Sequence, residues 1–207
     1  MKYYKLVLNA KNPKGFWGKM MIRSMNKNHY EVTGWGLSHF DFKSNHVALD
    51  VGCGGGRTVN RISKMVKKAY GLDYSELAVK KSVKYNRREI KNNKVEILRG
   101  SVSDLPFEDN TFDVVTAVET FYFWPDKLND LKEIKRTLKP DGTILMIFEM
   151  CKDESDPEKW KQVEELIGID APYEKDIVDI LTQAGYVDIK TDRVKENTWL
   201  VATARKE

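Results

Sequence analysis

Short apolar runs alternate with amphipathic stretches from residue 46 onward, and this alternation restricts the fold more than any other feature of the chain. The amphipathic stretches predict helices over 58–68, 75–91 and 126–138, because apolar residues recur there on one helical face. The intervening apolar runs predict strands at 47–51, 69–72, 94–98, 113–118 and 143–148. Strands that alternate with helices indicate an open, mostly parallel sheet covered by helices.

The end of the chain departs from this alternation. The segment 173–184 predicts a helix that Gly185 closes, and two strands follow near 186–191 and 197–204. Only a few polar residues separate these two strands, so we expect a hairpin. The sequence therefore predicts an α/β fold with a doubly wound, mostly parallel sheet of seven strands. One antiparallel strand should lie at or near its edge.

The N-terminal segment 1–45 does not fit the alternation and is rich in aromatic and methionine residues, including Phe16, Trp17 and Met20. Such material suits a small helical cap over a cleft better than a second core. We therefore predict a cap or lid at 1–45 and a main domain at 46–207. The alternative is an N-terminal extension packed on the edge of the sheet.

The length of 207 residues suits one domain, or one domain with a lid. No apolar run approaches the roughly 20 residues of a membrane helix, and the start lacks the apolar stretch of a signal peptide. We therefore expect a cytoplasmic protein with no membrane partner.

Cys53 and Cys151 belong to no CxxC pair or Cys/His cluster, which argues against a structural zinc site and a disulfide framework. The oligomeric state has no sequence signal.

The formal net charge of +4 conceals an asymmetry, because the first half of the chain is basic and the second half acidic. Such a division can indicate a nucleic-acid partner. Many of the cations, however, lie in the amphipathic segments 58–68 and 75–91, where a helix on the outside of a sheet needs a solvated face. Charge alone does not decide the partner.

A glycine-rich loop follows the first predicted strand. In an open parallel sheet, ligands bind outside the carboxyl ends of the strands. The segment 52–56 reads Gly-Cys-Gly-Gly-Gly, and Asp50 lies at the end of the strand before it. Glycines let the backbone approach a ligand closely and turn sharply into a helix. The spacing is GxGGG, which differs from the GxGxxG of dinucleotide-binding folds.

Carboxylates follow the next two strands. Asp73 ends the second strand, and its two acceptor oxygens suit both hydroxyls of a ribose, although an Asp in this place is more often a helix cap. Asp104, within Ser103–Phe107, could accept from the exocyclic amine of an adenine. The three features follow successive strands in order, which makes the set much more specific than any one member.

Together these segments resemble the class I S-adenosylmethionine-dependent methyltransferases, specifically the widespread small-molecule, methyltransferase-11-like type. The resemblance covers about residues 46–150 by motif and the C-terminal strand pair by layout. The matching segments are 47–56, 71–73, 103–107, 112–115 and 138–143.

The resemblance implies a Rossmann-like fold and S-adenosyl-L-methionine as cofactor, with S-adenosyl-L-homocysteine as product. It implies that Gly52 and Gly54 line the methionine moiety, Asp73 the ribose and Asp104 the adenine. Asp50 would hold the glycine loop or reach the amino group through water. The further cofactor-binding residues that it implies are Tyr74, Ser103 and Glu119.

The loop after the fourth strand, Glu119–Pro125, contains four consecutive aromatic residues. By the resemblance this loop faces the sulfonium methyl, and aromatic rings suit an apolar or cationic surface there. We predict that Trp35, Tyr122 and Trp124 contact the substrate; core packing of part of the aromatic run is the alternative. The loop lacks the Asn/Asp-Pro-Pro-Tyr/Phe motif of enzymes that methylate exocyclic base amines or certain glutamines.

We therefore expect methyl transfer by in-line displacement to an O, N, S or C nucleophile of a small molecule. A general base is needed only for a protonated acceptor; His29, His39 or Glu119 could serve, and the sequence selects none. No metal is implied.

The main alternative is a methyltransferase acting on RNA or protein, which the basic first half favours and the missing base-amine motif opposes; we do not expect a nucleic-acid partner. A nucleotide-binding oxidoreductase or a non-catalytic cofactor-binding protein is the remaining alternative.

Overall fold

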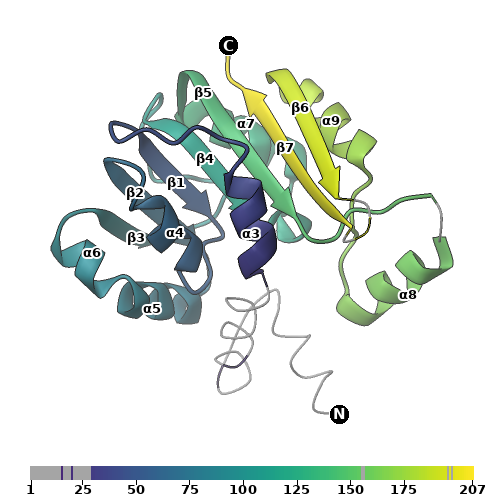
Figure 1. Cartoon of the computed structure of the whole chain (residues 1–207), viewed down its shortest axis with the longest axis horizontal. Helices are drawn as coiled ribbons and strands as arrows, with labels where there is room; N and C mark the ends of the chain where they lie inside the picture. The colour runs from purple at the N-terminus through teal and green to yellow at the C-terminus, as the bar shows by residue number, and fades with distance from the viewer. Residues whose placement is uncertain (1–14, 16–19, 21–28, 155–156, 195, 197) are drawn as a thin grey trace.

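The computed structural model describes residues 15, 20, 29–154, 157–194, 196 and 198–207. Within them seven strands form one sheet, in the order β3-β2-β1-β4-β5-β7-β6 (Figure 1). The strands are β1 (Val47–Val51), β2 (Lys68–Asp73), β3 (Val95–Arg99), β4 (Phe112–Val118), β5 (Leu138–Phe148), β6 (Val187–Val194) and β7 (Trp199–Arg205). The predicted seven-stranded α/β sheet is confirmed.

The sheet has a reversal in strand order beside β1. The chain runs outward from β1 through β2 to β3, and then continues on the other side of β1 with β4 and β5, all in parallel pairs. β7 lies between β5 and β6 and is antiparallel to both. The predicted hairpin and the antiparallel strand near the edge are therefore confirmed. The carboxyl ends of β1 and β4, where the order reverses, are the expected place for a ligand.

Helices cover both faces of the sheet (Figure 1). The described helices are α3 (Tyr30–Leu37), α4 (Arg57–Ile62), α5 (Glu76–Tyr85), α6 (Arg87–Lys91), α7 (Lys127–Thr137), α8 (Pro157–Ile167) and α9 (Glu174–Gln183). Val114 and Val115 are neighbours in β4 and both are 0% exposed, yet they belong to different hydrophobic clusters. One cluster includes residues of α3 and α4, and the other includes residues of α7 and α9. β4 is thus buried on both faces, as its β-branched run predicted.

Four elements differ from the sequence predictions. The helix predicted over 58–68 ends at Ile62, and Met65, an apolar residue of the predicted stretch, is exposed. The stretch 75–91 divides at Asn86, because its side-chain amide donates to backbone carbonyls of Gly56 and Ser82. β5 begins at Leu138, five residues before the predicted start at 143, because the Pro-Asp-Gly turn forms an irregularity within the strand. Helix α8 was not predicted.

The described end of the N-terminal segment packs on the sheet. α3 contacts β5 and β7, and its Val32 and Leu37 are buried. A Cβ at Gly36 would lie 2.4 Å from the Ile147 side chain, so a glycine lets this helix approach closely. The rest of the predicted cap, residues 1–28 apart from Gly15 and Met20, lies outside the described residues, so the cap stays a prediction. Among the described helices, none has the length and apolar character to span a membrane.

Candidate functional site: a cofactor edge and an acceptor edge

The glycine loop after β1 is tied to the neighbouring strand. The backbone N–H groups of Gly52 and Cys53 both donate to the Leu72 carbonyl, at 2.8 and 3.0 Å. Gly52 has a φ of +72°, and a Cβ there would lie 2.1 Å from the Thr120 hydroxyl oxygen. Gly54 has a φ of +52°, but the nearest atom to its Cβ position is 4.0 Å away. The loop therefore packs tightly at Gly52 and leaves open space at Gly54.

Asp73 joins the glycine loop to the helix after β2. One of its carboxylate oxygens accepts from the Gly54 N–H at 2.8 Å and the other from the Ser75 N–H at 2.8 Å. Ser75 is the N-cap of α5, as predicted, since its side chain accepts from the Ala78 N–H. Burial raises the pKa of Asp73. An ionised carboxylate offers about four acceptor sites, so both oxygens keep capacity for a ligand.

Asp50 lies beneath this loop. Its side chain is 3% exposed and accepts a hydrogen bond of 2.6 Å from the Thr116 hydroxyl. Burial raises the pKa of Asp50 to about 7, and the nearby Asp73 carboxylate contributes in the same direction. Asp50 is therefore placed to hold β1 to β4 at the point where the strand order reverses.

The third loop presents its polar side chains to solvent. Ser103 and Asp104 are both exposed, and so is Tyr74 after β2. Partial desolvation of the Tyr74 side chain, together with the neighbouring Asp73 carboxylate, raises the pKa of Tyr74 to about 12. The loops after β1, β2 and β3 thus lie along one edge of the sheet. We call it the cofactor edge, because the resemblance predicts a cofactor role for its members Gly52, Gly54, Asp73, Tyr74, Ser103 and Asp104.

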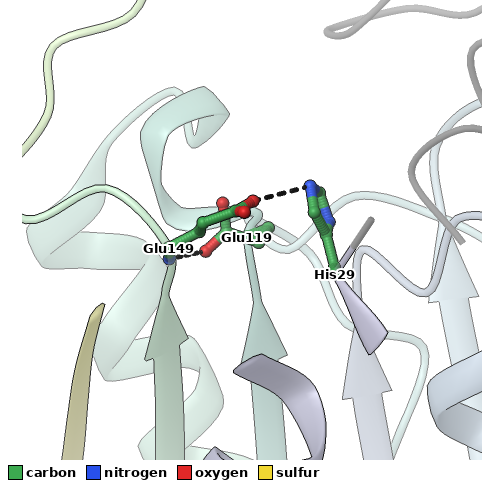
Figure 2. A group of neighbouring side chains, drawn as sticks. All are labelled: His29, Glu119 and Glu149. Atoms are coloured by element: carbon green, nitrogen blue, oxygen red, sulfur yellow. Dashed lines mark hydrogen bonds and ion pairs between the residues drawn. The ribbon is translucent and has the colours of Figure 1, made fainter. Parts of the chain in front are cut away.

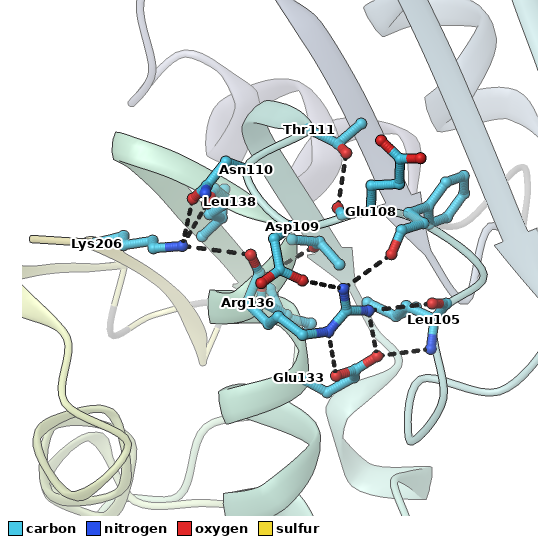
Figure 3. A network of polar contacts seen from close by, with 12 residues as sticks. Leu105, Glu108, Asp109, Asn110, Thr111, Glu133, Arg136, Leu138 and Lys206 are labelled. Atoms are coloured by element: carbon cyan, nitrogen blue, oxygen red, sulfur yellow. Dashed lines mark hydrogen bonds and ion pairs between the residues drawn. The ribbon is translucent and has the colours of Figure 1, made fainter.

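Arg136 of α7 fixes the chain that follows this third loop (Figure 3). Its guanidinium donates to the backbone carbonyls of Leu105 and Phe107, and to the carboxylates of Asp109 and Glu133. Glu133 in turn accepts from the Leu105 N–H at 2.9 Å. Sequence reasoning missed this network, because no motif connects an arginine in a helix to a loop about thirty residues earlier.

A second cluster lies at the carboxyl ends of β4 and β5 (Figure 2). Glu119 follows β4 with a φ of +55° and is only 6% exposed. Its carboxylate accepts from the backbone N–H of Glu149, which follows β5. The Glu149 carboxylate lies 3.2 Å from Nε2 of His29. We call His29, Glu119 and Glu149 the acceptor-edge cluster, and the part of the sheet end that carries it the acceptor edge, because the predicted substrate loop follows β4 there. One ligand atom from each residue lies within 4.8 Å of the others. The cofactor contact that the resemblance implies for Glu119 stays a prediction.

Burial opposes charge throughout the acceptor-edge cluster. It lowers the pKa of His29 to about 4, and it raises the pKa of Glu119 to about 8. Burial also raises the pKa of Glu149. Of the three candidate bases in the sequence, the structure brings His29 and Glu119 together. His39 instead lies against Asp192 of β6, at 2.9 Å.

The predicted substrate residues are not gathered in one place. Tyr122 and Trp124 are 8% and 7% exposed and belong to the hydrophobic cluster beneath α7 and α9. The Tyr122 hydroxyl hydrogen-bonds both the carbonyl and the N–H of Met150, so it supports the loop after β5. Trp35 packs against Trp199 and His39 in the other cluster. Packing accounts for the three side chains as the structure places them, and a substrate role for them stays a prediction.

Glu149 is the functional candidate that sequence reasoning missed. The rule that sites lie at the carboxyl ends of strands had selected the loops after the first four strands. Glu149 follows the fifth strand, so the same rule extended by one strand would have found it.

The strand order, the glycine loop after β1 and the carboxylate after β2 define the fold class, which is that of the Rossmann-like methyltransferases. A family model described as "Methyltransferase domain" matches residues 49–146. Residues 49–146 therefore form a methyltransferase domain of the class I S-adenosylmethionine-dependent type, as the motifs indicated. S-adenosyl-L-methionine is the cofactor of that family.

The relatives agree with this assignment. A demethylmenaquinone methyltransferase from Bacillus mycoides is 39% identical over 122 residues, which are 56% of this chain and 48% of the relative. The uncharacterized methyltransferase YdaC of Bacillus subtilis is 25% identical over 83% of this chain and 90% of its own. A SAM-dependent methyltransferase from Aquifex aeolicus superposes with a TM-score of 0.70 at 25% identity, covering 90% of this chain and 97% of that one. The chain thus spans about half the length of the first of these relatives.

Proposed function

We propose that the protein transfers the methyl group of S-adenosyl-L-methionine to a small-molecule acceptor bound at the acceptor edge. The observation that carries this proposal is a contact between the loops of the two edges. Thr120, against which Gly52 packs, is the residue after Glu119. The glycine loop of the cofactor edge therefore contacts the loop that carries Glu119, across the reversal in strand order.

The residues of the cofactor edge fit S-adenosyl-L-methionine. The open space at Gly54 would admit the methionine moiety, and the remaining acceptor sites of Asp73 suit the two ribose hydroxyls. The exposed Ser103 and Asp104 are placed to receive the adenine, on a segment that Arg136 holds in position. Asp50 supports the loop from beneath through its bond to Thr116.

The cofactor supplies an electrophilic methyl group on a sulfonium. The chain therefore has to position the acceptor, exclude water and leave the acceptor atom unprotonated. Phe121, Tyr122 and Trp124 belong to the loop after β4, and their side chains pack into the apolar core. A small-molecule acceptor also agrees with the name of the demethylmenaquinone relative.

A radiolabel experiment tests this function. Purified protein is incubated with methyl-labelled S-adenosyl-L-methionine and a cell extract, and the label is then separated into a small-molecule filtrate, RNA and protein. We expect label in the filtrate, and less label from an Asp73→Ala control when the cofactor is below saturation. Label confined to RNA or protein, or no label in any fraction while the cofactor still binds, would contradict the proposal.

RNA or protein is the second candidate acceptor, and one surface favours it. The helices α5 and α6 expose several cations beside Tyr85, which is 49% exposed. These cations are Lys80, Lys84, Arg87, Arg88 and Lys91. A basic face with an exposed aromatic ring is typical of nucleic-acid binding. The fractions of the same experiment distinguish the two candidates.

A further inference from the structure

The acceptor-edge cluster brings together three metal-ligating side chains from distant parts of the chain. His29 precedes α3, Glu119 follows β4 and Glu149 follows β5 (Figure 2). The three side chains point toward one another, and the set contains an imidazole nitrogen as well as carboxylate oxygens.

The spacing of these atoms suits a first-row divalent cation. Ligand bonds of about 2.1 Å place adjacent ligand atoms about 3.0 to 3.4 Å apart, in octahedral or tetrahedral geometry respectively. His29 Nε2 and the Glu149 oxygen are 3.2 Å apart, which is within this range. The ligand atoms of the cluster as a whole lie within 4.8 Å, so a glutamate side chain has to move inward for all three ligand atoms to bind one ion.

The type of ligand narrows the choice of ion. One imidazole with two carboxylates suits Mn²⁺, Fe²⁺ or Zn²⁺ better than Cu⁺, which prefers sulfur, or Mg²⁺, which prefers an all-oxygen site. Three protein ligands leave at least one coordination position open, as in catalytic rather than structural metal sites.

We propose that His29, Glu119 and Glu149 bind a divalent cation of the Mn²⁺ or Zn²⁺ type, whose open position takes an oxygen of the methyl acceptor. The role of the acceptor rests on the proposed function, whereas cation binding itself does not. A cation at this place holds the acceptor oxygen beside the glycine loop and lowers the pKa of its hydroxyl. The hydroxyl proton leaves to water, the oxygen forms a bond to the methyl carbon, and the electron pair of the broken C–S bond stays on sulfur.

A second histidine–carboxylate pair provides the matched comparison. His39 and Asp192 are 2.9 Å apart, and the two histidine side chains are 24% and 23% exposed for His39 and His29. Among the described residues, no third ligand joins the His39 pair, whereas Glu119 completes the other. If the His29–Glu149 contact is purely structural, replacing either histidine should have the same effect on cation binding.

The test measures Mn²⁺ binding directly. The full-length protein is treated with a chelator, and free Mn²⁺ is followed by electron paramagnetic resonance during titration of the wild type, Glu149→Gln, His29→Asn and His39→Asn. We expect one site in the wild type and in His39→Asn. We expect a loss of more than about tenfold in affinity in the other two, since removing a ligand should exceed the 10- to 100-fold effect of second-shell changes. Added Zn²⁺ should release the bound Mn²⁺.

Glu149→Gln keeps the size of the side chain, and circular dichroism checks its fold. Absence of a Mn²⁺ site in the wild type, or equal binding by all four proteins, would overturn the proposal. Calorimetry with S-adenosyl-L-methionine on the same samples keeps the two proposals separate. If the cofactor binds and Mn²⁺ does not, only the cation site fails; if the cofactor does not bind, the proposed methyl transfer fails.

Discussion

The cofactor edge and the acceptor edge lie at the same end of one sheet, but the chain builds them in different ways. The cofactor edge consists of consecutive loops, each after the next strand, and its carboxylate Asp73 binds the N–H groups of two of those loops. The acceptor edge draws His29, Glu119 and Glu149 from segments separated by up to 120 positions. Local motifs therefore describe the first edge, while only the folded chain assembles the second.

The electrostatics of the two edges also differ. Asp73 accepts two backbone hydrogen bonds, which offset part of the effect of burial on its pKa. Glu119 lies beside a second carboxyl, Glu149, and burial raises the pKa of both. Two backbone N–H groups thus stabilise the Asp73 carboxylate, whereas the Glu119 carboxylate accepts from the backbone N–H of Glu149 and lies beside the Glu149 carboxyl.

The largest expected effect concerns Asp50, beneath the cofactor edge. Its usual pKa of 3.8 rises to about 7 in the folded protein. Between those pH values the native state keeps a proton that the unfolded chain releases. Asp50 should therefore contribute a fall of up to about 4 kcal/mol in the free energy of unfolding as the pH rises. Asp50→Asn should remove this contribution and leave that of Glu119, whose pKa is also raised; urea unfolding of both proteins between pH 4 and pH 8 measures the difference.

Asp113 provides the control for that prediction, since its pKa shift has the opposite sign. Burial acts to raise its pKa, but bonds from the Lys139 ammonium and the Val47 N–H produce a net lowering. Its contribution to stability is present above its usual pKa and is lost as the pH falls. Asp113→Asn should therefore be destabilised at pH 7. A wild-type curve that is parallel to that of Asp50→Asn would contradict the Asp50 assignment.

The next effect tests the contact between the two edges. Gly52→Ala would place a Cβ 2.1 Å from the Thr120 hydroxyl oxygen at a φ of +72°. We expect a loss of about 3 kcal/mol in stability, from left-handed strain and overpacking together, and a loss of cofactor affinity. Gly54→Ala has similar strain without the clash and should lose only about 1 kcal/mol. Thermal unfolding of both variants checks the difference; equal losses would mean that the contact does not matter.

A smaller expected effect concerns the affinity of the cofactor edge for S-adenosyl-L-methionine. Asp73→Ala should weaken S-adenosyl-L-methionine binding at least about tenfold, or about 1.4 kcal/mol, because hydrogen bonds to a charged group are lost. Isothermal titration calorimetry measures this, with Asp113→Asn as the control that should keep wild-type affinity. Unchanged affinity in Asp73→Ala would refute the ribose assignment.

The smallest expected effect concerns the hydrogen bonds of Tyr122 that hold the loop after β5 in the acceptor edge. Tyr122→Phe removes a hydroxyl that bonds both backbone groups of Met150, and it should cost about 1 kcal/mol. Tyr186→Phe removes a similarly buried hydroxyl bonded to the Leu131 carbonyl, far along the chain from this loop. Urea unfolding should show similar losses, whereas methyl transfer should fall only in Tyr122→Phe. Equal transfer rates would show that the Met150 loop does not position the acceptor.

The fold was predictable to the extent that it depends on local pattern. The periodicity of short runs predicted seven strands in a mostly parallel sheet with one antiparallel strand, because a buried strand and an amphipathic helix need different spacings of apolar residues. Exact bounds were not predictable. α4 ends early, and the stretch 75–91 divides where Asn86 binds the Gly56 carbonyl, a contact between residues thirty positions apart.

The sequence by itself determined the placement of the cofactor-edge residues after successive strands, because glycine turns and strand ends leave a local pattern; their role in cofactor binding stays a prediction. Only the tertiary structure decided the acceptor edge. It separated His29 from His39, added Glu149, and buried Tyr122 and Trp124 in the core. The physical reason is that these positions depend on which strands lie side by side and on the packing of distant side chains, and neither leaves a local pattern in the chain.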